Sequence, residues 1–372
     1  MASCHVLDAV DRLLQDVRKD CRPFGGVCIL LRGDVKQLLP VAAGRVRQIE
    51  LYFTNCKAWI HFKVLKLKIN MRIETGEDEF AKWLEELGQG TLNEKVIDNS
   101  VDSVRLSEHC LTNNITEDVF GHPDSLTAEQ LASRAILCPK NEHCNRLNDV
   151  MLESFPGPLI TLRSSDSVAS GDEDEIANFQ LEYLNSITPS GMPLHEFKIK
   201  VGVPVILLRN LNLNDGLING TRLLVLSVTD ALITAKIVNG RFIGRITFIP
   251  RMDLTSSDKT IPITLKRRQF PLKVCFALTI NKAQGQTFNQ VGIYLGSPVF
   301  SHGQLYVAFS RARNWNAVKV KVEQTKHQGK LLKFEILKQH SYQKYSFRQH
   351  SKDHRINNHL SQEPINHKCV EI

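Results

Sequence analysis

The stretch from residue 275 to residue 322 constrains the fold more than any other part of this 372-residue chain. An apolar run (Cys-Phe-Ala-Leu-Thr-Ile) is followed by the polar segment 281–287, by a second apolar run over 291–295, and by an amphipathic stretch over 303–313. Short apolar runs that alternate with polar turns and amphipathic helices are typical of parallel α/β domains. In such domains the polar turns meet ligands at the carboxyl edge of the sheet. We therefore expect two buried strands, a helix, and a polar turn placed to contact a ligand.

Other segments of the chain repeat this pattern. Continuous apolar runs predict buried strands over 27–31 and 203–208, and a further strand is expected over 64–69. Apolar residues at helical spacing predict helices over 6–18, 77–87 and 141–151, and over 126–137 a helix that runs into a strand. The polar, glycine-containing residues 163–180 predict an exposed loop.

Between residues 221 and 266 the rhythm changes to short apolar runs separated by turn residues. Two such turns are Asp230-Ala231 and Asn239-Gly240, and an Asn-Gly pair between apolar runs predicts a β-hairpin. The predicted fold class is therefore α/β, with parallel sheets and an inserted small antiparallel β barrel.

The formal net charge of +8 is concentrated at one end of the chain. Residues 310–372 hold 13 Lys and Arg against 5 Asp and Glu, so that the rest of the chain is neutral. An asymmetric basic end indicates a polyanionic partner, and a solvated lysine-rich tail is the alternative.

The cysteines and the apolar runs indicate where such a chain resides. Nine cysteines without a C-x-x-C pair predict a reducing compartment rather than a disulfide framework. Cys138, His143 and Cys144 lack the second half of a zinc site. No run reaches the ~18 apolar residues of a membrane span, and the first residues lack the basic and apolar parts of a signal peptide. We therefore expect a soluble, intracellular chain.

Polar residues that follow the predicted strands are candidates for phosphate contacts. Gly33 follows the run over 27–31 and would let the chain turn sharply. Gln37 carries an amide that both donates and accepts, so it can sense a phosphate or a water. Arg72 follows the run over 64–69, where an arginine can stabilise the charge of phosphoryl transfer. An ordinary strand-end turn and a surface arginine are the alternatives.

The last helix and the turn before it carry a second set of candidates. Arg311 and Arg313 come at the end of the predicted helix, where they can serve phosphates or complement the helix dipole. Residues 281–287 supply amide, ammonium and hydroxyl donors around the permissive Gly285. Such a set suits the grip of a phosphate backbone, which requires donors rather than base readout.

Taken in order, these segments resemble the motifs of a known family. The matching segments are Gly33-Asp34-Val35-Lys36-Gln37-Leu38-Leu39-Pro40, Asn70-Met71-Arg72, Leu184-Asn185-Ser186-Ile187-Thr188-Pro189-Ser190-Gly191, Leu207-Leu208-Arg209-Asn210-Leu211, Gly216-Leu217-Ile218-Asn219-Gly220-Thr221-Arg222, residues 279–288 and Tyr306-Val307-Ala308-Phe309-Ser310-Arg311. They resemble the PIF-type (petite integration frequency) DNA helicases, RecD-related 5′→3′ motors of superfamily one, and among them the type linked to Helitron transposons. The resemblance covers residues 1–325.

The resemblance implies two RecA-like domains that hold ATP between them. The implied divisions are a remnant of the first RecA-like domain with a linker over 1–90, the first part of the second domain over 91–220, a Src-homology-like β barrel over 221–268, the last part of the second domain over 269–325, and a basic, histidine-rich tail over 326–372. The barrel is expected to help hold single-stranded DNA, and the tail to be disordered.

The resemblance also implies roles for individual residues. Catalysis is assigned to Gln37, Arg72 and Arg311, with both arginines on the γ-phosphate. Nucleotide binding is assigned to Gly33, Asp34, Gln284 and Gly285, and contact with the DNA backbone to Asn281, Lys282, Gln286 and Thr287. The implied cofactors are ATP and Mg²⁺. The implied partners are single-stranded or forked DNA and RNA–DNA hybrids, bound by a nuclear monomer in replication, repair, recombination and telomere maintenance.

The chain departs from the family's pattern at the phosphate loop. No G-x-x-x-x-G-K-[ST] occurs in the sequence, and the family's Asp-Glu magnesium pair would stand before Met1. Val35 replaces the usual aromatic residue, and Arg32 stands where glycine is common. Each group that stabilises the transition state contributes ~3 kcal/mol or more. We therefore expect an N-terminally truncated chain that does not hydrolyse ATP alone.

Three hypotheses follow from these observations. The chain is the C-terminal portion of an ATP-dependent DNA helicase, or a non-catalytic nucleic-acid-binding remnant of a transposon-derived helicase. The third hypothesis is a product without a stable fold, because an incomplete first sheet would expose an edge.

Overall fold

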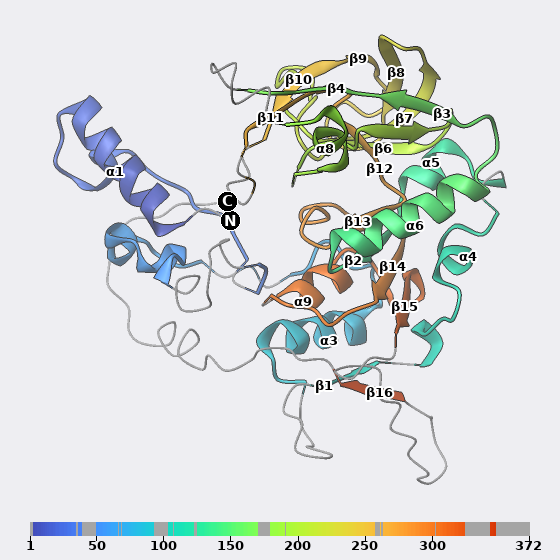
Figure 1. Ribbon diagram of the computed structural model, residues 1–372. Helices are drawn as coiled ribbons and strands as arrows, with labels where there is room; N and C mark the ends of the chain where they lie inside the picture. The colour runs from blue at the N-terminus through green and yellow to red at the C-terminus, as the bar shows by residue number, and fades with distance from the viewer. Residues whose placement is uncertain are drawn as a thin grey trace, which may run out of the picture. The chain divides into compact units, whose positions relative to one another are not determined.

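The structure is a computed structural model that describes residues 3–34, 36–38, 50–65, 67, 69–92, 103–106, 108–122, 125–169, 179–189, 191–256, 261, 263–301, 303–323 and 343–346. The chain divides into two compact units, and each is described by itself (Figure 1). Unit 1 comprises Met1–Cys110, Ser297–Asn316 and Val322–Ile372, and unit 2 comprises Leu111–Gly296 and Ala317–Lys321.

Unit 1 begins with the helix expected over 6–18, which spans Cys4–Arg18 (α1). Its inner side packs on three short 3-10 helices, η1 (Pro23–Gly26), η2 (Phe53–Asn55) and η3 (Lys57–His61). The buried core of this cluster consists of Cys4, Phe24, Cys56 and Ala58. The predicted apolar face of α1 is covered only in part, because Leu7 and Leu14 pack against this core while Val6, Leu13 and Val17 are exposed.

The strands predicted over 27–31 and 64–69 are wrong. Residues 27–31 are extended but unpaired in any sheet, and Leu30 is 50% exposed. The described residues of the second segment form no strand either, and Leu67 is 82% exposed. A buried central strand requires neighbours on both sides. Among the described residues of unit 1 the strands are β1 (Ser103–Leu106) and β16 (Gln343–Ser346), which pair with each other in antiparallel fashion.

The expected acidic helix is present as α3 (Asp78–Gln89), and the expected last helix as α9 (Gln304–Phe309). An aromatic cluster of Phe80, Trp83, Phe309 and Trp315 joins them, with ring centroids 4.8 Å apart for Trp83–Phe309 and 4.7 Å apart for Trp83–Trp315. The helix α9 is shorter than predicted, because Ser310 caps it and Arg311 lies just beyond its end. The predicted tail over 326–372 lies outside the described residues, apart from β16.

Unit 2 contains a four-stranded sheet of order β13-β2-β14-β15. These strands span Ala277–Thr279 (β13), Arg134–Cys138 (β2), Gln290–Leu295 (β14) and Val318–Val322 (β15). Strand β2 runs parallel to both neighbours, since Ile136 pairs with Ala277 on one side and with Gly292 on the other. The helices packed on this sheet are α4 (Ile115–Phe120), α5 (Ala128–Ala132) and α6 (Asn141–Ser154). The predicted parallel α/β fold is thus confirmed here.

Antiparallel strands, drawn from green to orange in Figure 1, make up the rest of unit 2. They form a five-stranded sheet of order β12-β6-β7-β8-β9, a three-stranded sheet of order β10-β11-β4 and the pair β3-β5. Their bounds are Ile160–Arg163 (β3), Ser165–Val168 (β4), Glu196–Ile199 (β5), Pro204–Leu207 (β6), Arg222–Val228 (β7), Leu232–Ile237 (β8), Ile246–Pro250 (β9), Met252–Thr255 (β10), Leu265–Gln269 (β11) and Leu272–Val274 (β12). One hydrophobic cluster runs from Ile115 of α4 through Ile136 of β2 to Ile249 of β9, so both kinds of sheet share a core.

Two predictions about this antiparallel region need correction. The loop predicted over 163–180 contains β4, whose Asp166 and Val168 are buried because β4 pairs with β11; residues 170–178 lie outside the described part of the chain. Asn239-Gly240 forms no tight hairpin, since residues 237–245 connect the paired positions Lys236 and Ile246. The side-chain oxygen of Asn239 instead accepts the backbone N–H of Arg222 at 2.8 Å.

The apolar run after residue 271 is two strands rather than one. Strand β12 pairs antiparallel with β6, whereas β13 pairs parallel with β2. Between them, Cys275 and Phe276 are fully buried, and the chain crosses from one sheet to the other. Within the described part of the chain, no helix combines the length and apolar character needed to traverse a bilayer.

Candidate functional site

In unit 1, the polar turn that follows residues 27–31 is built by a carboxylate rather than by glycine. Asp34 accepts the backbone N–H of Lys36 on its side chain at 3.0 Å, and its carbonyl accepts the N–H of Gln37 at 3.2 Å. The chain turns directly after Gly33, but Gly33 does not adopt a positive φ, so this turn does not depend on the conformational freedom of glycine. An aspartate side chain that binds the backbone two residues on creates a turn by itself.

Two side chains converge on Asp34. Its Oδ2 accepts the hydroxyl of Tyr306 at 2.8 Å and the side-chain amide of Gln37 at 3.3 Å. Burial raises the pKa of the Tyr306 hydroxyl, and the charge of Asp34 adds to that effect. The phenol therefore stays protonated and able to donate. This contact fixes the Gln37 turn against α9.

A glycine at the start of α9 permits this close approach. Gly303 has φ +73, and a Cβ at this position would lie 2.5 Å from the carbonyl oxygen of Lys36 and 2.6 Å from that of Gln37. Both the left-handed backbone and the missing side chain are therefore required here. The sequence in front of α9 thus allows the Gln37 turn to touch the helix.

Residues 70–74 are hydrogen-bonded to the other end of α9. Arg72 donates from Nη1 to the carbonyl of Ser310 at 3.1 Å, and Glu74 donates its backbone N–H to the carbonyl of Arg313 at 3.2 Å. The side chain of Asn314 donates to the Glu74 carboxylate at 2.6 Å. Arg72 is thus held at the end of α9, although its segment forms no strand.

Arg311 is fully buried at the same end of α9. Its Nε donates to the carbonyl of Val307 at 2.9 Å, and Nη2 donates to the hydroxyl of Ser310 at 2.8 Å. Burial, followed by the positive charge of Arg72, lowers the pKa of Arg311 to about 10, so the side chain remains a cation at neutral pH. Two neighbouring guanidinium groups present donors and charge that suit a phosphate. Arg313, by contrast, is exposed.

In unit 2, residues 281–287 form a compact turn between β13 and β14. Lys282 and Ala283 donate backbone N–H groups to the carbonyl of Thr279, at 2.9 and 3.2 Å. The side-chain amide of Gln286 donates to the carbonyl of Lys282 at 3.1 Å, and Gly285 takes φ +82. Asn281 and Thr287 are exposed on either side of this turn, Gln284 is half-buried, and the whole segment presents donors at the carboxyl end of β13.

Lys282, the one cation in the 281–287 turn, lies where a positive charge is disfavoured. Burial lowers the pKa of Lys282, and the positive charge of Lys273 lowers it further. Lys273 in turn has a pKa lowered by burial. A cluster of cations that disfavour one another gains from an anion bound between them. The turn is therefore suited to a phosphate ligand.

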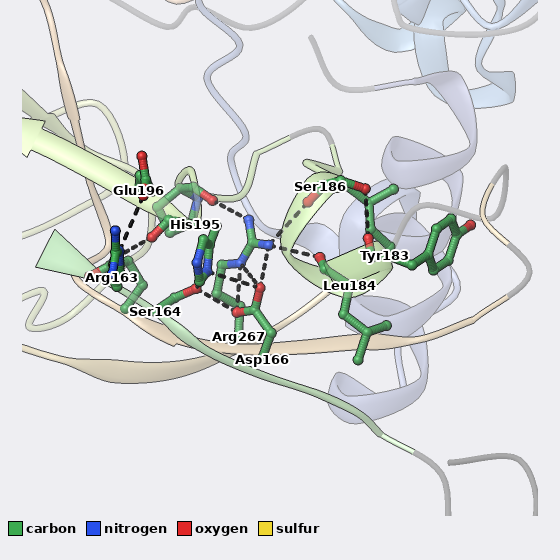
Figure 2. Close-up of polar contacts among 12 residues, drawn as sticks. Arg163, Ser164, Asp166, Tyr183, Leu184, Ser186, His195, Glu196 and Arg267 are labelled. Atoms are coloured by element: carbon green, nitrogen blue, oxygen red, sulfur yellow. Dashed lines mark hydrogen bonds and ion pairs between the residues drawn. The ribbon is translucent and has the colours of Figure 1, made fainter. Parts of the chain in front are cut away.

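A buried network in unit 2 binds Leu184 and Ile187 of the matching motif that begins at Leu184 (Figure 2). The guanidinium of Arg267 binds both oxygens of Asp166, with Nε–Oδ1 at 2.9 Å and Nη2–Oδ2 at 2.6 Å. It also donates to the carbonyls of Leu184, Ile187 and Pro193, at 3.1, 3.1 and 2.9 Å. Both charged side chains are completely buried. Arg267 thus binds the end of α8 (Leu181–Ser186) and two residues that follow it, Ile187 and Pro193.

Ser164 and His195 lie at the edge of this network. The hydroxyl of Ser164 donates to Asp166 at 2.6 Å and lies 2.8 Å from Nδ1 of His195. The same Nδ1 of His195 lies 3.6 Å from Oδ2 of Asp166, whereas nucleophilic catalysis requires one ring nitrogen on the serine and the other on the carboxylate. The network is therefore structural. In the described part of the chain, no cluster of three His, Cys, Asp or Glu side chains is placed to hold a metal ion.

The structure gathers part of the predicted site and leaves the rest separate. Gln37, Asp34, Arg72 and Arg311 come together around α9 in unit 1, with Gly33 at the start of the turn. The residues of the 281–287 turn, among them the predicted nucleotide contacts Gln284 and Gly285, belong to unit 2. Sequence reasoning missed Tyr306 and Gly303 as site residues, although both lie in or beside a matching motif.

Two family models match the chain. One, described as PIF1-like helicase, matches residues 1–98, and the other, described as DNA helicase Pif1, 2B domain, matches residues 182–228. Among curated proteins, the chain is 26% identical over 320 residues to the ATP-dependent DNA helicase PIF1 of Homo sapiens, covering 86% of this chain and 44% of that protein. It is 26% identical over 302 residues to the ATP-dependent DNA helicase Pif1 of Campylobacter jejuni, covering 78% of this chain and 62% of that protein.

Solved structures show the same likeness in fold. A crystal structure of Bacteroides Pif1 bound to ssDNA matches with a TM-score of 0.61 and 23% identity, over 86% of this chain and 68% of that chain. A second structure of that helicase, in complex with ADP-AlF3 and ssDNA, matches with a TM-score of 0.58 at 23% identity, over the same shares of the two chains. The chain spans about half the length of the curated relatives it matches, 44% of the human protein among them.

Proposed function

We propose, from the premise that this chain belongs to the PIF1-like helicase family, that it works in the ATP-dependent 5′→3′ unwinding of DNA. The observation that carries the proposal is the position of Gln37 at the start of α9 and of Arg72 and Arg311 together at its end. These residues come from three separate segments of the sequence, and each has a chemistry that suits a phosphate. Relatives of the chain are named ATP-dependent DNA helicases, which supports the proposal.

Within this proposal, unit 1 senses the nucleotide. Arg72 and Arg311 are the cations for the γ-phosphate, where they would stabilise the charge of phosphoryl transfer. Gln37 reads the nucleotide state through the turn that Asp34 and Tyr306 hold against α9. The donor set around α9 fits an ATP phosphate, because it places two cations side by side. Gly33, Gln284 and Gly285 are proposed as further nucleotide contacts, and Mg²⁺ as the accompanying ion.

Unit 2 is proposed to bind the DNA backbone. Asn281, Lys282, Gln286 and Thr287 supply an amide, an ammonium and a hydroxyl at one turn, which suits contact with phosphates regardless of base sequence. The proposed substrates are single-stranded and forked DNA, and RNA–DNA hybrids in addition. The solved structures of similar helicases that contain ssDNA support this part of the proposal.

The wider expectations from the family resemblance also belong to this proposal. They are the divisions of the chain at residues 90, 220, 268 and 325, a nuclear monomer, a role in genome maintenance, and an origin linked to Helitron transposons. The strands β4, β6 and β12 show that the antiparallel sheets draw on residues outside 221–268. The domain division is therefore best tested on segments that include those strands.

A second candidate function is nucleic-acid binding without ATP turnover. It is favoured by the 281–287 turn, whose donors all lie within unit 2. The two candidates are separated by measuring ATP turnover and DNA affinity on the same protein. DNA-stimulated turnover supports the helicase, and salt-dependent DNA binding without turnover supports the binding module.

The decisive variant is Arg311→Ala, measured in this chain and in the longer helicase if turnover requires it. We expect ATP turnover to fall by about a thousandfold, the magnitude typical of an arginine finger, while affinity for labelled oligothymidylate stays unchanged. Arg313→Ala is the matched control, because this exposed arginine lies two residues away. Normal turnover in Arg311→Ala would refute the catalytic role. A parent protein that does not bind oligothymidylate at low or at high salt would refute the nucleic-acid role.

A further inference from the structure

We infer that two buried side chains, Asn148 and Arg222, are positioning residues that hold the 281–287 turn in the geometry required for a phosphate backbone. The inference rests on the proposed DNA contact of this turn and adds residues outside it. Both side chains are almost completely buried, at 4% and 1% exposure, and each is polar. Asn148 contacts the chain before the turn, and Arg222 contacts the chain after it.

Asn148 holds the strand that leads into the turn. This residue lies on α6, and its Nδ2 donates to the carbonyl of Ala277 at 3.0 Å while its Oδ1 accepts the N–H of the same residue at 2.8 Å. Strand β13 is at the edge of its sheet, with β2 on one side. Asn148 therefore pairs with the outward backbone groups of β13 as a neighbouring strand would. The entry to the turn is thereby fixed on α6.

Arg222 holds the segment that leaves the turn. Its Nη1 donates to the carbonyl of Ala132 at 2.5 Å, and its Nη2 donates to the carbonyl of Arg134 at 3.0 Å. The guanidinium carbon lies 5.1 Å from the ring centroid of Phe288, the residue that directly follows the turn. A cation at this distance from an aromatic ring attracts it, and the attraction is stronger where both are buried.

The corner at residues 132–134 anchors both Arg222 and the chain beyond the turn. The backbone N–H of Asn289 donates to the carbonyl of Ser133 at 2.7 Å, between the two carbonyls that Arg222 binds. Arg222 Nη2 also lies 3.4 Å from the carbonyl of Cys275, in the crossing between β12 and β13. One guanidinium thus connects the crossing before the turn with the exit after it.

The energetic cost of this arrangement argues for positioning rather than for packing alone. Removing a guanidinium from water is costly, and here its Nη1 and Nη2 donate to uncharged carbonyl oxygens. Its Nε is buried and has no hydrogen-bond partner among the residues that the structure describes. An apolar side chain of similar volume would fill the same space at no such cost. What the guanidinium adds is direction, because its planar fork binds two separate backbone segments, residues 132–134 and Cys275, and faces the ring of Phe288.

Fixed ends matter because contact with a phosphate depends on position. Ligand groups must be held within about 0.5 Å of their productive geometry. Lys282 and Gln286 lie between the segments that Asn148 and Arg222 hold, and we call Asn148 and Arg222 the clamps. Loosening either clamp should leave the donors present but displaced. The expected consequence is weaker DNA binding with the fold of unit 2 retained.

The test compares Asn148→Ala and Arg222→Lys with the control Lys200→Met in the full chain. Lys200 is a buried cation of the same unit that donates to the carbonyl of Phe155 at 2.5 Å and takes no part in the turn. Binding of fluorescein-labelled oligothymidylate is measured by anisotropy at several salt concentrations, and amide exchange is followed in residues 281–287 and in β8. All three variants are expected to lower the unfolding midpoint.

Only the two clamp variants are expected to weaken DNA binding, by about tenfold, and to speed exchange within 281–287. They should also reduce the slope of log affinity against log salt by about one, because Lys282 no longer meets its phosphate. If Arg222→Lys does not fold, Phe288→Leu takes its place, since it removes only the aromatic face.

Three results would overturn the inference or its premise. Clamp variants that bind and exchange like the parent exclude positioning, and an equal loss of affinity in Lys200→Met assigns the effect to general stability. A parent chain that does not bind oligothymidylate at low salt removes the proposed DNA contact itself. Amide exchange within 281–287 then tests the positioning role by itself. Unchanged exchange in both clamp variants rejects that role, and faster exchange supports it.

Discussion

Arg267 in unit 2 and Arg311 in unit 1 are both fully buried, yet their electrostatic surroundings differ, since the charge of Asp34 raises the pKa of Arg311 less than burial and the charge of Arg72 lower it. Arg267 faces both carboxylate oxygens of Asp166 and three backbone carbonyls, as Figure 2 shows. Arg311 lies beside the cation Arg72, and burial together with that charge lowers its pKa. A buried cation matched by a carboxylate is complete without a ligand. A cation beside another cation gains when an anion arrives.

This difference separates an arginine that holds the fold from one suited to a ligand. Burial alone cannot make the distinction, because both side chains have no exposed surface. The charge of the nearest neighbours can. Two experiments test this distinction on the arginines themselves, and a third applies it to Lys282. Their expected effects decrease in size.

The largest effect is expected from Asp166→Ala, which leaves Arg267 as a buried cation without its carboxylate. We expect the free energy of unfolding to fall by about 3–5 kcal/mol, measured by urea denaturation. Asp253→Ala is the control, because that exposed carboxylate binds Lys266 and Arg268 at the surface and should matter little. A loss below about 1 kcal/mol in Asp166→Ala would mean that Arg267 does not depend on charge compensation.

A smaller effect is expected from Arg311→Met. The variant loses hydrogen bonds to Val307 and Ser310, each contributing about 1 kcal/mol, but it also removes a buried cation from beside Arg72. These terms offset each other, so we expect the free energy of unfolding to change by about 1 kcal/mol or less. If urea denaturation shows a loss as large as that of Asp166→Ala, the proposed difference between the two arginines is wrong.

The smallest effect concerns Lys282, whose pKa is lowered by burial and by Lys273. The ammonium is present below its folded pKa and is lost as the pH rises through that value. DNA affinity should therefore decline with rising pH before the usual lysine pKa is reached. Lys282→Arg keeps its charge and should bind about threefold more tightly than the parent at alkaline pH, one phosphate contact being at stake. Parallel pH profiles for parent and variant would exclude a phosphate contact at Lys282.

Local patterns predicted those elements whose neighbours lie close in the sequence. The helices α1, α3 and α6 and the strands β6 and β14 lie where the periodicity places them. The strands predicted over 27–31 and 64–69 failed, because an apolar run becomes a strand only when other strands pair with it. Strand β4 was missed for the converse reason, since its polar sequence is ordered by its pairing with β11.

The candidate site shows the same division. Matching motifs predicted Asp34, Gln37, Arg72 and Arg311 as a set, and the structure brings them together around α9. The contact between Tyr306 and Asp34 joins residues 272 positions apart, and no local pattern reports such a pair. Sequence reasoning also missed Asn148 and Arg222 as positioning residues. Asn148 lies on an ordinary amphipathic helix, and Arg222 ends a matching motif, but its partners at residues 132–134 and 275 are far away in the sequence.

The sequence by itself determined which chemical groups this protein has and the order in which they occur: an amide, two arginines, and a turn of donors between two apolar runs. Periodicity and turn residues are local properties, so they survive in the sequence without the fold. Tertiary structure decided which of the buried arginines meets a carboxylate and which meets a second cation. That outcome depends on contacts across the chain, and electrostatic energy in a buried site is set by the nearest neighbours in space.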